Sequence, residues 1–283
     1  MKVEEYYDED TLKKVQSVQK QILKDVQKVC EENDIDIFLL FGSALGVVRH
    51  QGFIPWDDDI DVGVFREDFS RLKNVLEKEL GDKYEFLTCE NNKNYACTVT
   101  HFQKKGTKFI SKDAINCDYV PGINIDFFVY DHLADGWLAR KIQFFEAWFL
   151  GRLLFLSGKG TPFIPYEGAK GTIARSICST VRTVLKILRI TPTKIYHRFQ
   201  KVSQRYNYKE TKCIASFEPP KSWLNVTSKS KMYPLKKMPF DEFEVYVPGD
   251  VHEHLKSLFG DYMKLPPKDK RVNHRPLVID FGE

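Results

Sequence analysis

An acidic run, Asp57-Asp58-Asp59-Ile60-Asp61, stands directly before an apolar segment in the N-terminal half of the chain. Residues two apart in a β-strand point to the same side, so Asp59 and Asp61 can present two carboxylates to one point. Hard divalent cations prefer such oxygen ligands, and a metal that bridges substrate phosphates needs few of them from the protein. A structural calcium loop is excluded, because an EF-hand spacing that starts at Asp57 requires glycine where the chain has Val62. The run therefore predicts a metal site.

A third carboxylate, Asp126, stands alone inside the apolar run Ile123–Phe128. Burying a lone carboxylate is costly unless it is paired or bound to metal. We therefore expect Asp59, Asp61 and Asp126 to be both the metal ligands and the catalytic carboxylates, with magnesium, or else manganese, as the cofactor. Asp126 could act as the general base or only as a ligand. The alternative is that it caps a turn or pairs with a lysine.

The dipeptide Gly42-Ser43 is expected to lie between a strand and a helix. Backbone N–H groups at the start of a helix attract anions, and a small residue lets a phosphate approach them. The alternative is an ordinary helix start, because serine is a preferred N-cap on any helix. Since this turn precedes the segment with Asp59 and Asp61, a phosphate site and a metal site could face each other.

The elements that must position these residues begin with a helix and a strand. Apolar residues recur every three or four positions between residues 12 and 33, which predicts an amphipathic helix. The almost wholly apolar segment Ile35–Phe41 is typical of an interior strand. Ser43 is expected to cap the helix that follows, which should run to about Arg49.

The remaining elements predict an α+β (α/β) fold, with a mixed β-sheet core flanked by helices and a largely helical C-terminal half. The expected strands lie at 60–65, 84–89, 96–103, 108–111, 123–130 and 243–247, and the expected helices at 69–80, 137–156, 172–189, 192–206 and 251–259. A turn should join the strands at 96–103 and 108–111 into a hairpin. The expected regions are a catalytic core at 1–135, a helical, basic and amphipathic segment at 136–212, and a mixed region at 213–283 that completes the active site.

Composition limits the class of protein. The chain has 283 residues, of which 42% are hydrophobic and 29% charged, as in ordinary folded proteins. A net charge of +4 is too mild to imply nucleic acid as a partner, and six cysteines without a CxxC pair argue against a zinc site or a disulfide framework. The acidic segment 1–10 is unlike a secretory signal, and the most apolar stretch, 142–156, is too short to span a bilayer. A cytoplasmic location is therefore expected.

Positive charge is concentrated between Gly171 and Lys212, where ten Lys or Arg residues accompany a single acid, Glu210. On a helical wheel, a basic face falls opposite an apolar face. The basic face holds Arg175, Arg182, Lys186 and Arg189, and the apolar face holds Ile173, Ile177, Val181, Val184 and Leu188. Such a helix could lie peripherally on the anionic inner face of the plasma membrane. Two alternatives are burial of the apolar face on the catalytic core and binding of an acidic glycan.

Several ordered strings of residues resemble the LicD family, which also includes the fukutin-related transferases. The matching strings are Phe41–His50, Gly52–Asp61, Ile125–Phe128 with Asp131, and Phe259–Pro267 followed by Arg271 and His274. The resemblance spans about residues 10–275 and implies a nucleotidyltransferase-type fold. In that fold the Gly-Ser turn, the Asp59-Ile60-Asp61 pair and the Asp126 strand form the usual metal and phosphate site.

The resemblance also implies substrates. Bacterial members resemble phosphocholine transferases that use CDP-choline to modify teichoic acid, lipopolysaccharide or capsule, and eukaryotic relatives transfer ribitol phosphate from CDP-ribitol. The chain would thus be a metal-dependent transferase that moves phosphocholine, or a related alcohol phosphate, from a CDP-activated donor to a hydroxyl of a glycan acceptor, which could be lipid-linked, and releases CMP. Ser43-Ala44 replaces the Thr-Leu of many members, and Phe128-Val129 replaces Phe-Pro, so the donor stays open.

Further residues are expected to contact the substrate besides Gly42 and Ser43. They are Arg49, His50, Trp56, Asp58, Arg271 and His274. The arginines and histidines could bind a diphosphate, with a plain surface position as the alternative for Arg271 and His274. Trp56 could support a quaternary ammonium group or pack against the loop.

Two other functions are weighed against the transferase. A nucleotidyltransferase acting on RNA or protein could hold its polymer on the basic segment, but no aromatic-basic RNA motif is present. A non-catalytic choline- or glycan-binding module would have no need of the three intact acids. Both are therefore weaker interpretations than the transferase.

Overall fold

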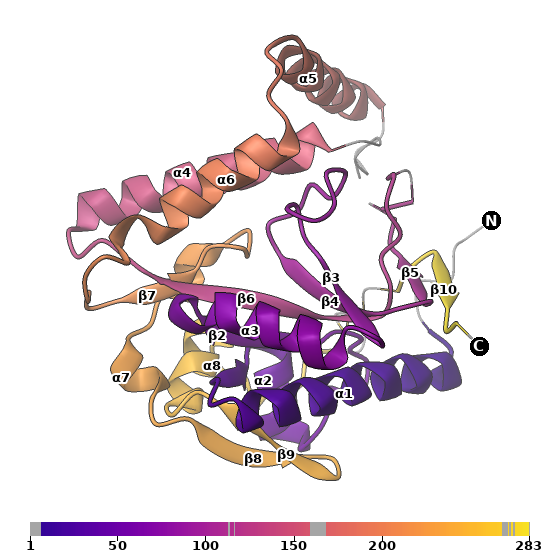
Figure 1. Ribbon diagram of the computed structural model, residues 1–283, viewed down its shortest axis with the longest axis vertical. Helices are drawn as coiled ribbons and strands as arrows, with labels where there is room; N and C mark the ends of the chain where they lie inside the picture. Colours follow the sequence, from indigo (N-terminus) through magenta and orange to yellow (C-terminus); the bar gives the residue numbers. More distant parts are fainter. Residues whose placement is uncertain are drawn as a thin grey trace.

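The computed structural model describes residues 7–112, 114, 115, 117–158, 168–267, 271, 273 and 275–282. Within this part of the chain, a six-stranded mixed sheet forms the centre and helices flank it (Figure 1). Its strands, in spatial order, are β1 (Ile37–Leu39), β2 (Asp61–Phe65), β6 (Asn124–His132), β4 (Thr100–Lys104) and β3 (Tyr84–Leu87), with β7 (Ile214–Ser216) also paired to β6. Strands β2 and β6 are parallel, and the other pairs are antiparallel. The expected α+β class is confirmed.

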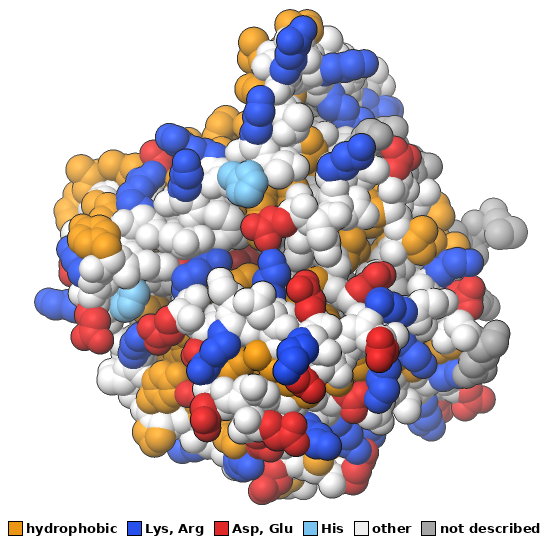
Figure 2. All heavy atoms as spheres, in the orientation of Figure 1, with side chains coloured by type: hydrophobic (Ala, Val, Ile, Leu, Met, Phe, Trp, Pro, Cys, Tyr) orange, Lys and Arg blue, Asp and Glu red, His pale blue; other side chains and the backbone are white. Residues whose placement is uncertain are grey.

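Helices cover the sheet and build a second layer beside it. They are α1 (Glu9–Glu32), α2 (Phe41–His50), α3 (Arg66–Leu80), α4 (Trp137–Ser157), α5 (Gly168–Ile187), α6 (Pro192–Ser203), α7 (Lys229–Met232) and α8 (Val251–Phe259), with 3-10 turns η1 (Gln204–Tyr206) and η2 (Ser222–Leu224). Two small antiparallel pairs join β5 (Lys108–Ile110) to β10 (Val278–Asp280) and β8 (Lys236–Phe240) to β9 (Phe243–Val247). Helix α5 projects beyond the rest of the molecule (Figure 1, Figure 2).

The main core lies between the sheet and the helices α1 and α3. Apolar residues of α1, among them Ile22 and Val26, are fully buried there, as the amphipathic pattern predicts. They pack with Phe69 and Leu72 of α3 and with Phe127 of β6. This core fixes the strands that carry the candidate acids.

One strand lies elsewhere in the sheet than its sequence predicts. The apolar segment at 35–41 forms β1, which is an edge strand rather than an interior one. All three of its residues are nevertheless buried, and β9 contacts the strand. Because the edge is covered, an edge strand here carries the apolar sequence of an interior strand.

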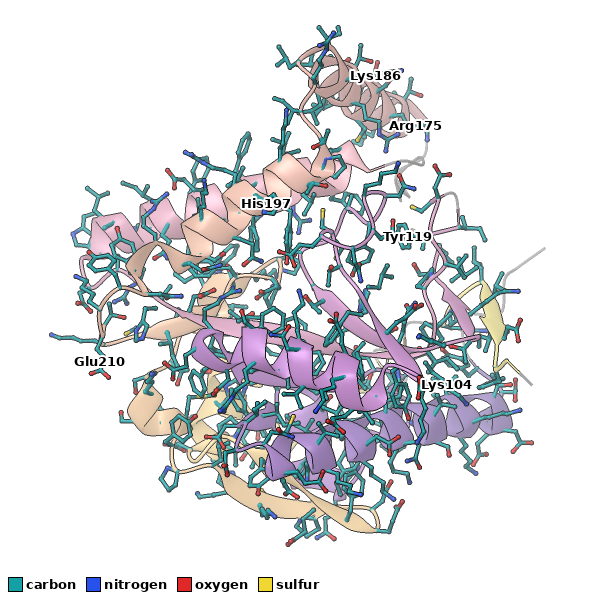
Figure 3. The ribbon with its side chains drawn as sticks, in the orientation of Figure 1. Lys104, Tyr119, Arg175, Lys186, His197 and Glu210 are labelled. Carbon is teal, nitrogen blue, oxygen red and sulfur yellow. The ribbon has the colours of Figure 1, made fainter. Side chains whose placement is uncertain are left out.

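The expected hairpin of 96–103 with 108–111 is wrong. Strand β4, which ends at Lys104 (Figure 3), pairs with β3 on one side and with β6 on the other, so neither edge is open to β5. Strand β5 pairs with β10 near the C-terminus instead. The Thr107 hydroxyl fixes the turn, since it donates to the Lys104 carbonyl (2.7 Å) and accepts from the Ile123 N–H (2.9 Å).

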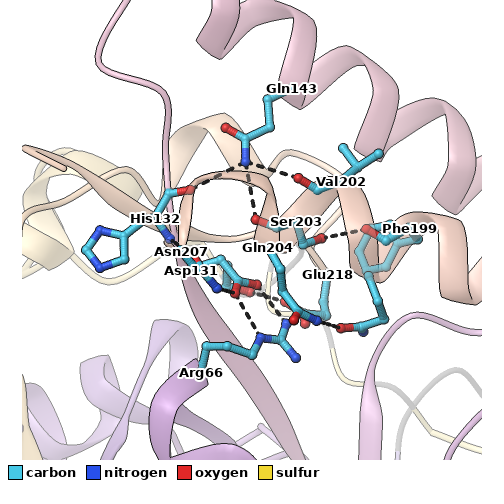
Figure 4. A network of polar contacts seen from close by, with 12 residues as sticks. Arg66, Asp131, His132, Gln143, Phe199, Val202, Ser203, Gln204, Asn207 and Glu218 are labelled. Atoms are coloured by element: carbon cyan, nitrogen blue, oxygen red, sulfur yellow. Dashed lines mark hydrogen bonds and ion pairs between the residues drawn. The ribbon is translucent and has the colours of Figure 1, made fainter. Parts of the chain in front are cut away.

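Helices α4 and α6 pack on one another and form the second layer. Phe144 of α4 meets Phe199 and Val202 of α6 in a separate small core. The buried amide of Gln143 joins the two helices, because it donates to the carbonyls of Val202 and Ser203, each at 3.2 Å (Figure 4). The helices of the described part include none that is both long and apolar enough to cross a bilayer.

A buried ion pair connects this layer to the sheet (Figure 4). The Arg66 guanidinium donates two hydrogen bonds to the Asp131 carboxylate (2.8 and 2.7 Å), and the Asn207 amide donates a third (2.5 Å). Burial raises the pKa of the neighbouring Glu218 carboxyl to about 7. Bidentate pairs of this kind are strong, and losing one partner leaves a buried charge without compensation. Asp131, one of the positions that carry the family resemblance, thus joins α3, β6 and the turn after α6.

Candidate active site

The parallel strands β2 and β6 place two predicted acids opposite each other. Asp61 opens β2, and its register partner in β6 is Asp126. Adjacent strands lie about 4.8 Å apart, so the two residues stand side by side at the same level of the sheet. Asp59 lies two residues before β2, in the loop that enters the strand rather than in the strand itself. Its charge nevertheless acts on Asp61, so the three predicted acids gather at one end of the β2–β6 pair.

Negative charge accumulates around Asp61. Burial raises the pKa of this carboxyl well above its usual value, and the carboxylates of Asp59, Asp126 and Asp57 raise it further. A bound cation would relieve this repulsion, and clustered carboxylate oxygens are the ligands that magnesium takes. The donor set therefore fits a divalent metal in charge and in chemistry.

The side chains are not arranged as a closed metal site. Among the described residues, no group of three His, Cys, Asp or Glu side chains is placed so that it could hold a metal ion. One oxygen of Asp126 is held by other partners, because the His101 ring contacts it and the Asn124 amide donates to it at 2.5 Å. Coordination by all three acids would need a different Asp126 rotamer or its second oxygen. The metal site thus rests on charge and position.

His101 and Asn124 are candidate site residues that the sequence interpretation missed. His101 is the register partner of Asp126 in β4, and its Nδ1 contacts the Asp126 carboxylate and lies 3.0 Å from the Asn124 amide nitrogen. The Tyr95 ring packs edge-on against His101, with centroids 5.4 Å apart. These contacts hold the Asp126 carboxylate in position. The contact with His101 also allows one proton to be shared between the imidazole and this carboxylate. The two-residue spacing of Asn124 and Asp126 on one strand face is a sequence signal, whereas the contact with His101 is long-range.

Helix α1 and the segment before it hold the acidic loop in place. The Gln16 amide donates to the Asp57 carbonyl (2.8 Å), and the Gln19 amide donates to the Asp58 carbonyl (2.7 Å). The Tyr7 hydroxyl donates to the Asp58 carboxylate (2.7 Å), and burial together with that carboxylate raises the pKa of Tyr7. Asp58, which was expected to bind substrate, is thus buried and supports the loop.

The Gly42-Ser43 turn meets the acids in an unexpected way. Helix α2 begins at Phe41, so Ser43 lies inside its first turn, and the expected serine N-cap is wrong. Phe41, the first residue of the helix, has a left-handed backbone with φ of 44°. The Ser43 hydroxyl instead accepts a hydrogen bond from the Asp61 N–H at 2.8 Å. A Cβ on Gly42 would lie 3.1 Å from Oδ2 of Asp57, so glycine leaves room for the acidic loop.

The other predicted substrate residues form a cationic cluster at the end of α2. Arg49 donates to the Tyr262 carbonyl (2.9 Å) and to the His50 ring (3.0 Å). The Arg271 guanidinium lies over the Trp56 ring, 4.4 Å from its centroid, and the rings of Trp56 and His50 meet edge to face. Burial and Arg271 lower the pKa of Arg49, while burial and Arg49 lower the pKa of His50. The guanidinium groups of Arg49 and Arg271, whose charges act on each other, would together attract an anion such as a diphosphate.

The acidic group and the cationic cluster lie at different ends of α2. Gly42 and Arg49 are seven residues apart, which corresponds to about 10 Å along a helix. One face of the Trp56 ring is covered by Arg271, which leaves less of it for a quaternary ammonium group. His274 lies outside the described residues. Gly42 and Ser43 therefore lie beside the acids. The other described candidates, except Asp58, lie together in the cationic cluster; they are Arg49, His50, Trp56 and Arg271.

Comparisons with known proteins show what the chain is similar to. Residues 34–150, which include both candidate strands, match the family model described as LicD/FKTN/FKRP, nucleotidyltransferase domain. The lipopolysaccharide cholinephosphotransferase LicD of Haemophilus influenzae is 26% identical over 278 residues, which cover 93% of this chain and 96% of that protein. An uncharacterized protein of Rickettsia prowazekii is 33% identical over 115 residues, or 42% of its length.

A more distant match covers the ribitol 5-phosphate transferase FKRP of Homo sapiens, which is 38% identical over 53 residues. That alignment takes in only 19% of this chain and 11% of FKRP, so it reports on one part of the domain. The Haemophilus match, in contrast, runs through all three expected regions of the chain. The chain is therefore similar to a LicD transferase over almost its whole length, and its residues 34–150 match the nucleotidyltransferase domain of the LicD/FKTN/FKRP family.

Proposed function

We propose that this transferase moves phosphocholine, or a related alcohol phosphate, from a CDP-activated donor to a hydroxyl of lipopolysaccharide, teichoic acid or a capsule precursor. The similarity to the Haemophilus cholinephosphotransferase over 93% of the chain supports the choice of substrate class. The observation that carries the proposal is the pairing of Asp61 with Asp126 on parallel strands, with Asp59 beside them. Phosphoryl-type transfer depends on charge neutralisation and positioning, and this acidic end of the sheet can supply both once a cation is present.

Asp59, Asp61 and Asp126 would hold the divalent metal, magnesium or manganese. When bound, the metal would neutralise charge on the donor phosphates and on the departing oxygen. The other roles fall to groups of the chain itself. His101 and Asn124 orient the Asp126 carboxylate, and Ser43 fixes the backbone at Asp61.

The proposed transfer forms one bond and breaks one. The acceptor oxygen attacks the phosphorus that bears the alcohol group, and the bond from that phosphorus to the oxygen of CMP breaks. Asp126 takes the proton of the acceptor hydroxyl, and His101 beside it can share that proton. The first turn of α2, which includes Gly42, offers backbone N–H groups to a phosphate oxygen.

The cationic cluster of Arg49, His50 and Arg271 is proposed to contact the anionic part of a substrate. Its distance of about 10 Å from Gly42 along α2 suits a group away from the reacting phosphorus, such as the far end of the nucleotide or a charged acceptor. We place the enzyme in the cytoplasm at the inner face of the plasma membrane, where a lipid-linked acceptor would be presented. Nucleic acid is not a proposed partner.

Thermal unfolding with candidate donors tests the proposal. CDP-choline, CDP-ethanolamine, CDP-ribitol and CDP-glycerol are each added with magnesium, because a ligand that binds the native state raises its unfolding temperature. One donor should stabilise the wild type selectively, release CMP when acceptor is added, and lose both effects in Asp61→Asn. The matched control is Asp82→Asn, an exposed acid remote from the cluster in sequence. A protein that responds to none of the four donors contradicts the proposed transfer.

A further inference from the structure

Helix α4 is apolar on two sides, only one of which is covered. Its inner side, with Phe144, Ala147 and Leu154, packs against α6 and neighbouring elements. Its outer side presents large apolar residues to solvent. These are Trp137, Leu138, Ile142, Phe145, Trp148, Phe149 and Phe155, and the exposed fractions of Trp137 and Phe145 are 68% and 63%. Helices that are hydrophobic all round are normally buried, so this outer side calls for a partner.

The exposed residues of α4 form one continuous stripe. Leu138, Ile142, Phe145 and Phe149 are spaced by three or four positions, which places them along one face of the helix. The Lys141 ammonium lies over the Trp137 ring at 4.8 Å and adds positive charge to the same end. Tryptophan, phenylalanine and lysine together on an exposed helix face are typical of a membrane interface.

Helix α5, which contacts α4, carries a second exposed apolar face. Ile173, Ile177 and Ile187 are 60%, 57% and 73% exposed, and Val184 and Leu188 are also exposed. Of the five residues of the predicted apolar face, four are thus exposed and only Val181 packs against the core, so the alternative that α5 buries this face on the rest of the chain is wrong for most of the face. Contacts at its C-terminal half attach the helix, since Leu185 is buried and Arg182 donates to the Leu156 carbonyl at 3.2 Å.

The two helices belong to one projecting part of the molecule. They contact each other, and hydrophobic side chains gather along the outer edge over α4 and at the tip over α5 (Figure 2). Arg175 and Lys186 emerge from α5 at the same tip (Figure 3). From residue 169 to residue 209 the sequence has ten Lys or Arg residues and no acid. The apolar surface is thus flanked by positive charge.

We propose that the outer faces of α4 and α5 form a docking surface for an anionic lipid bilayer, called here the α4–α5 surface. The positive charge selects this occupant over a second copy of the chain, because an identical surface would bring like charges together. An anionic bilayer offers the opposite charge and an apolar layer within reach of the aromatic side chains. No helix of the described part spans the bilayer, so the contact is peripheral. The purpose of this docking depends on the proposed function: a bilayer contact would bring the enzyme to a lipid-linked acceptor.

Vesicle flotation of the purified chain tests the α4–α5 surface without any turnover. The vesicles contain either phosphatidylcholine alone or equal parts of phosphatidylcholine and phosphatidylglycerol. The wild type should float with the anionic vesicles, and the bound fraction should fall as salt is raised. Phe145→Asp and Ile177→Asp should each weaken the binding about tenfold or more, because a charge then enters the apolar layer. Arg175→Gln with Lys186→Gln should remove the preference for anionic vesicles.

The matched control is Leu277→Asp, which changes an exposed apolar residue next to β10 and should leave binding intact. Equal unfolding temperatures would show that each variant still folds. The proposal would be overturned if Phe145→Asp and Ile177→Asp both bound anionic vesicles as well as wild type does. It would also be overturned if wild type did not float with anionic vesicles. A dimer in light scattering that Phe145→Asp dissolves, without vesicle binding, would assign the surface to a second copy. Binding of the CDP donor is measured in every variant as well. It tests the proposed transferase function independently of vesicle binding.

Discussion

Replacing Asp61 with asparagine should stabilise the metal-free protein while it disables the enzyme. Burial and three neighbouring carboxylates raise the pKa of Asp61, so its charged form is disfavoured in the fold. Asparagine has nearly the same shape and removes the charge. The hydrogen bond from the residue 61 N–H to Ser43 belongs to the backbone and is kept.

The size of the effect follows from the register of the sheet. Asp61 and Asp126 are partners on adjacent strands, about 5 Å apart. Two unit charges at this distance repel by about 0.8 kcal/mol in water and about 3 kcal/mol at an effective dielectric constant near 20. Asp61→Asn should therefore raise the free energy of unfolding by about 1 to 3 kcal/mol at pH 8 without divalent cations. For a chain of this size that corresponds to about 2 to 12 °C in Tm.

The pH dependence has a definite sign. The folded pKa of Asp61 lies above its unfolded value of about 3.9, so the folded state binds the proton more tightly. Wild-type stability from this group therefore falls as pH rises from about 4 towards the folded pKa, and stays low above it. The advantage of Asp61→Asn should be largest at pH 8 and disappear near pH 4.

Thermal unfolding of wild type and variant at pH 4, 6 and 8, with and without magnesium, measures both dependences. Magnesium should raise the Tm of wild type more than that of Asp61→Asn and so shrink or reverse the difference. The exposed control Asp82→Asn should stay within about 0.5 kcal/mol of wild type. A variant that is no more stable than wild type at pH 8 in chelator would refute the charge cluster as the cause.

Three further substitutions test the contacts around the site. Ser43→Ala removes the acceptor for a backbone N–H and should lower the free energy of unfolding by about 1 kcal/mol in chemical denaturation, with Ser43→Thr closer to wild type. His101→Ala should reduce kcat about 10- to 100-fold and alter the pH–rate profile with little change in donor binding, because it positions Asp126; an unchanged profile would exclude the imidazole. Arg66→Ala should cost about 3 to 5 kcal/mol, because Asp131 keeps a buried charge, and pairing it with Asp131→Asn should restore part of the loss; strict additivity in this double-mutant cycle would rule out the coupling.

The parts of the fold that local patterns determine could be predicted from the sequence. Helix α1 and the strand β2 follow from periodicity and from an apolar run, and both form where expected. Pairing between distant strands has no local signal. The apolar sequence of β1 indicates burial, which is correct, but burial comes from cover by β9 and not from a central place in the sheet. The hairpin error at β5 has the same origin, because occupation of both β4 edges is a property of the whole sheet.

The candidate site shows the same division. The acids could be predicted, because carboxylates beside apolar strands are costly without a partner. His101 could not, because only the register between β4 and β6 brings it to Asp126. The helical wheel of α5 predicts two faces, whereas the exposure of the apolar face depends on packing that the wheel does not contain.

Helix α2 explains why the predicted substrate residues divide into two groups. Its first turn meets the acidic loop at Gly42 and binds Asp61 through Ser43, while its last turn carries Arg49 about 10 Å away. The loop that follows returns from Arg49 to Asp57, so one helix and one loop connect the cationic cluster to the acids. Arg271 comes from the distant C-terminal region and lies over the Trp56 ring of that loop, so the C-terminal region contributes a residue to the cationic cluster. A substrate that contacts both groups, as we propose, would therefore meet the acids of the sheet at its reacting phosphate and residues from distant parts of the sequence at its other end.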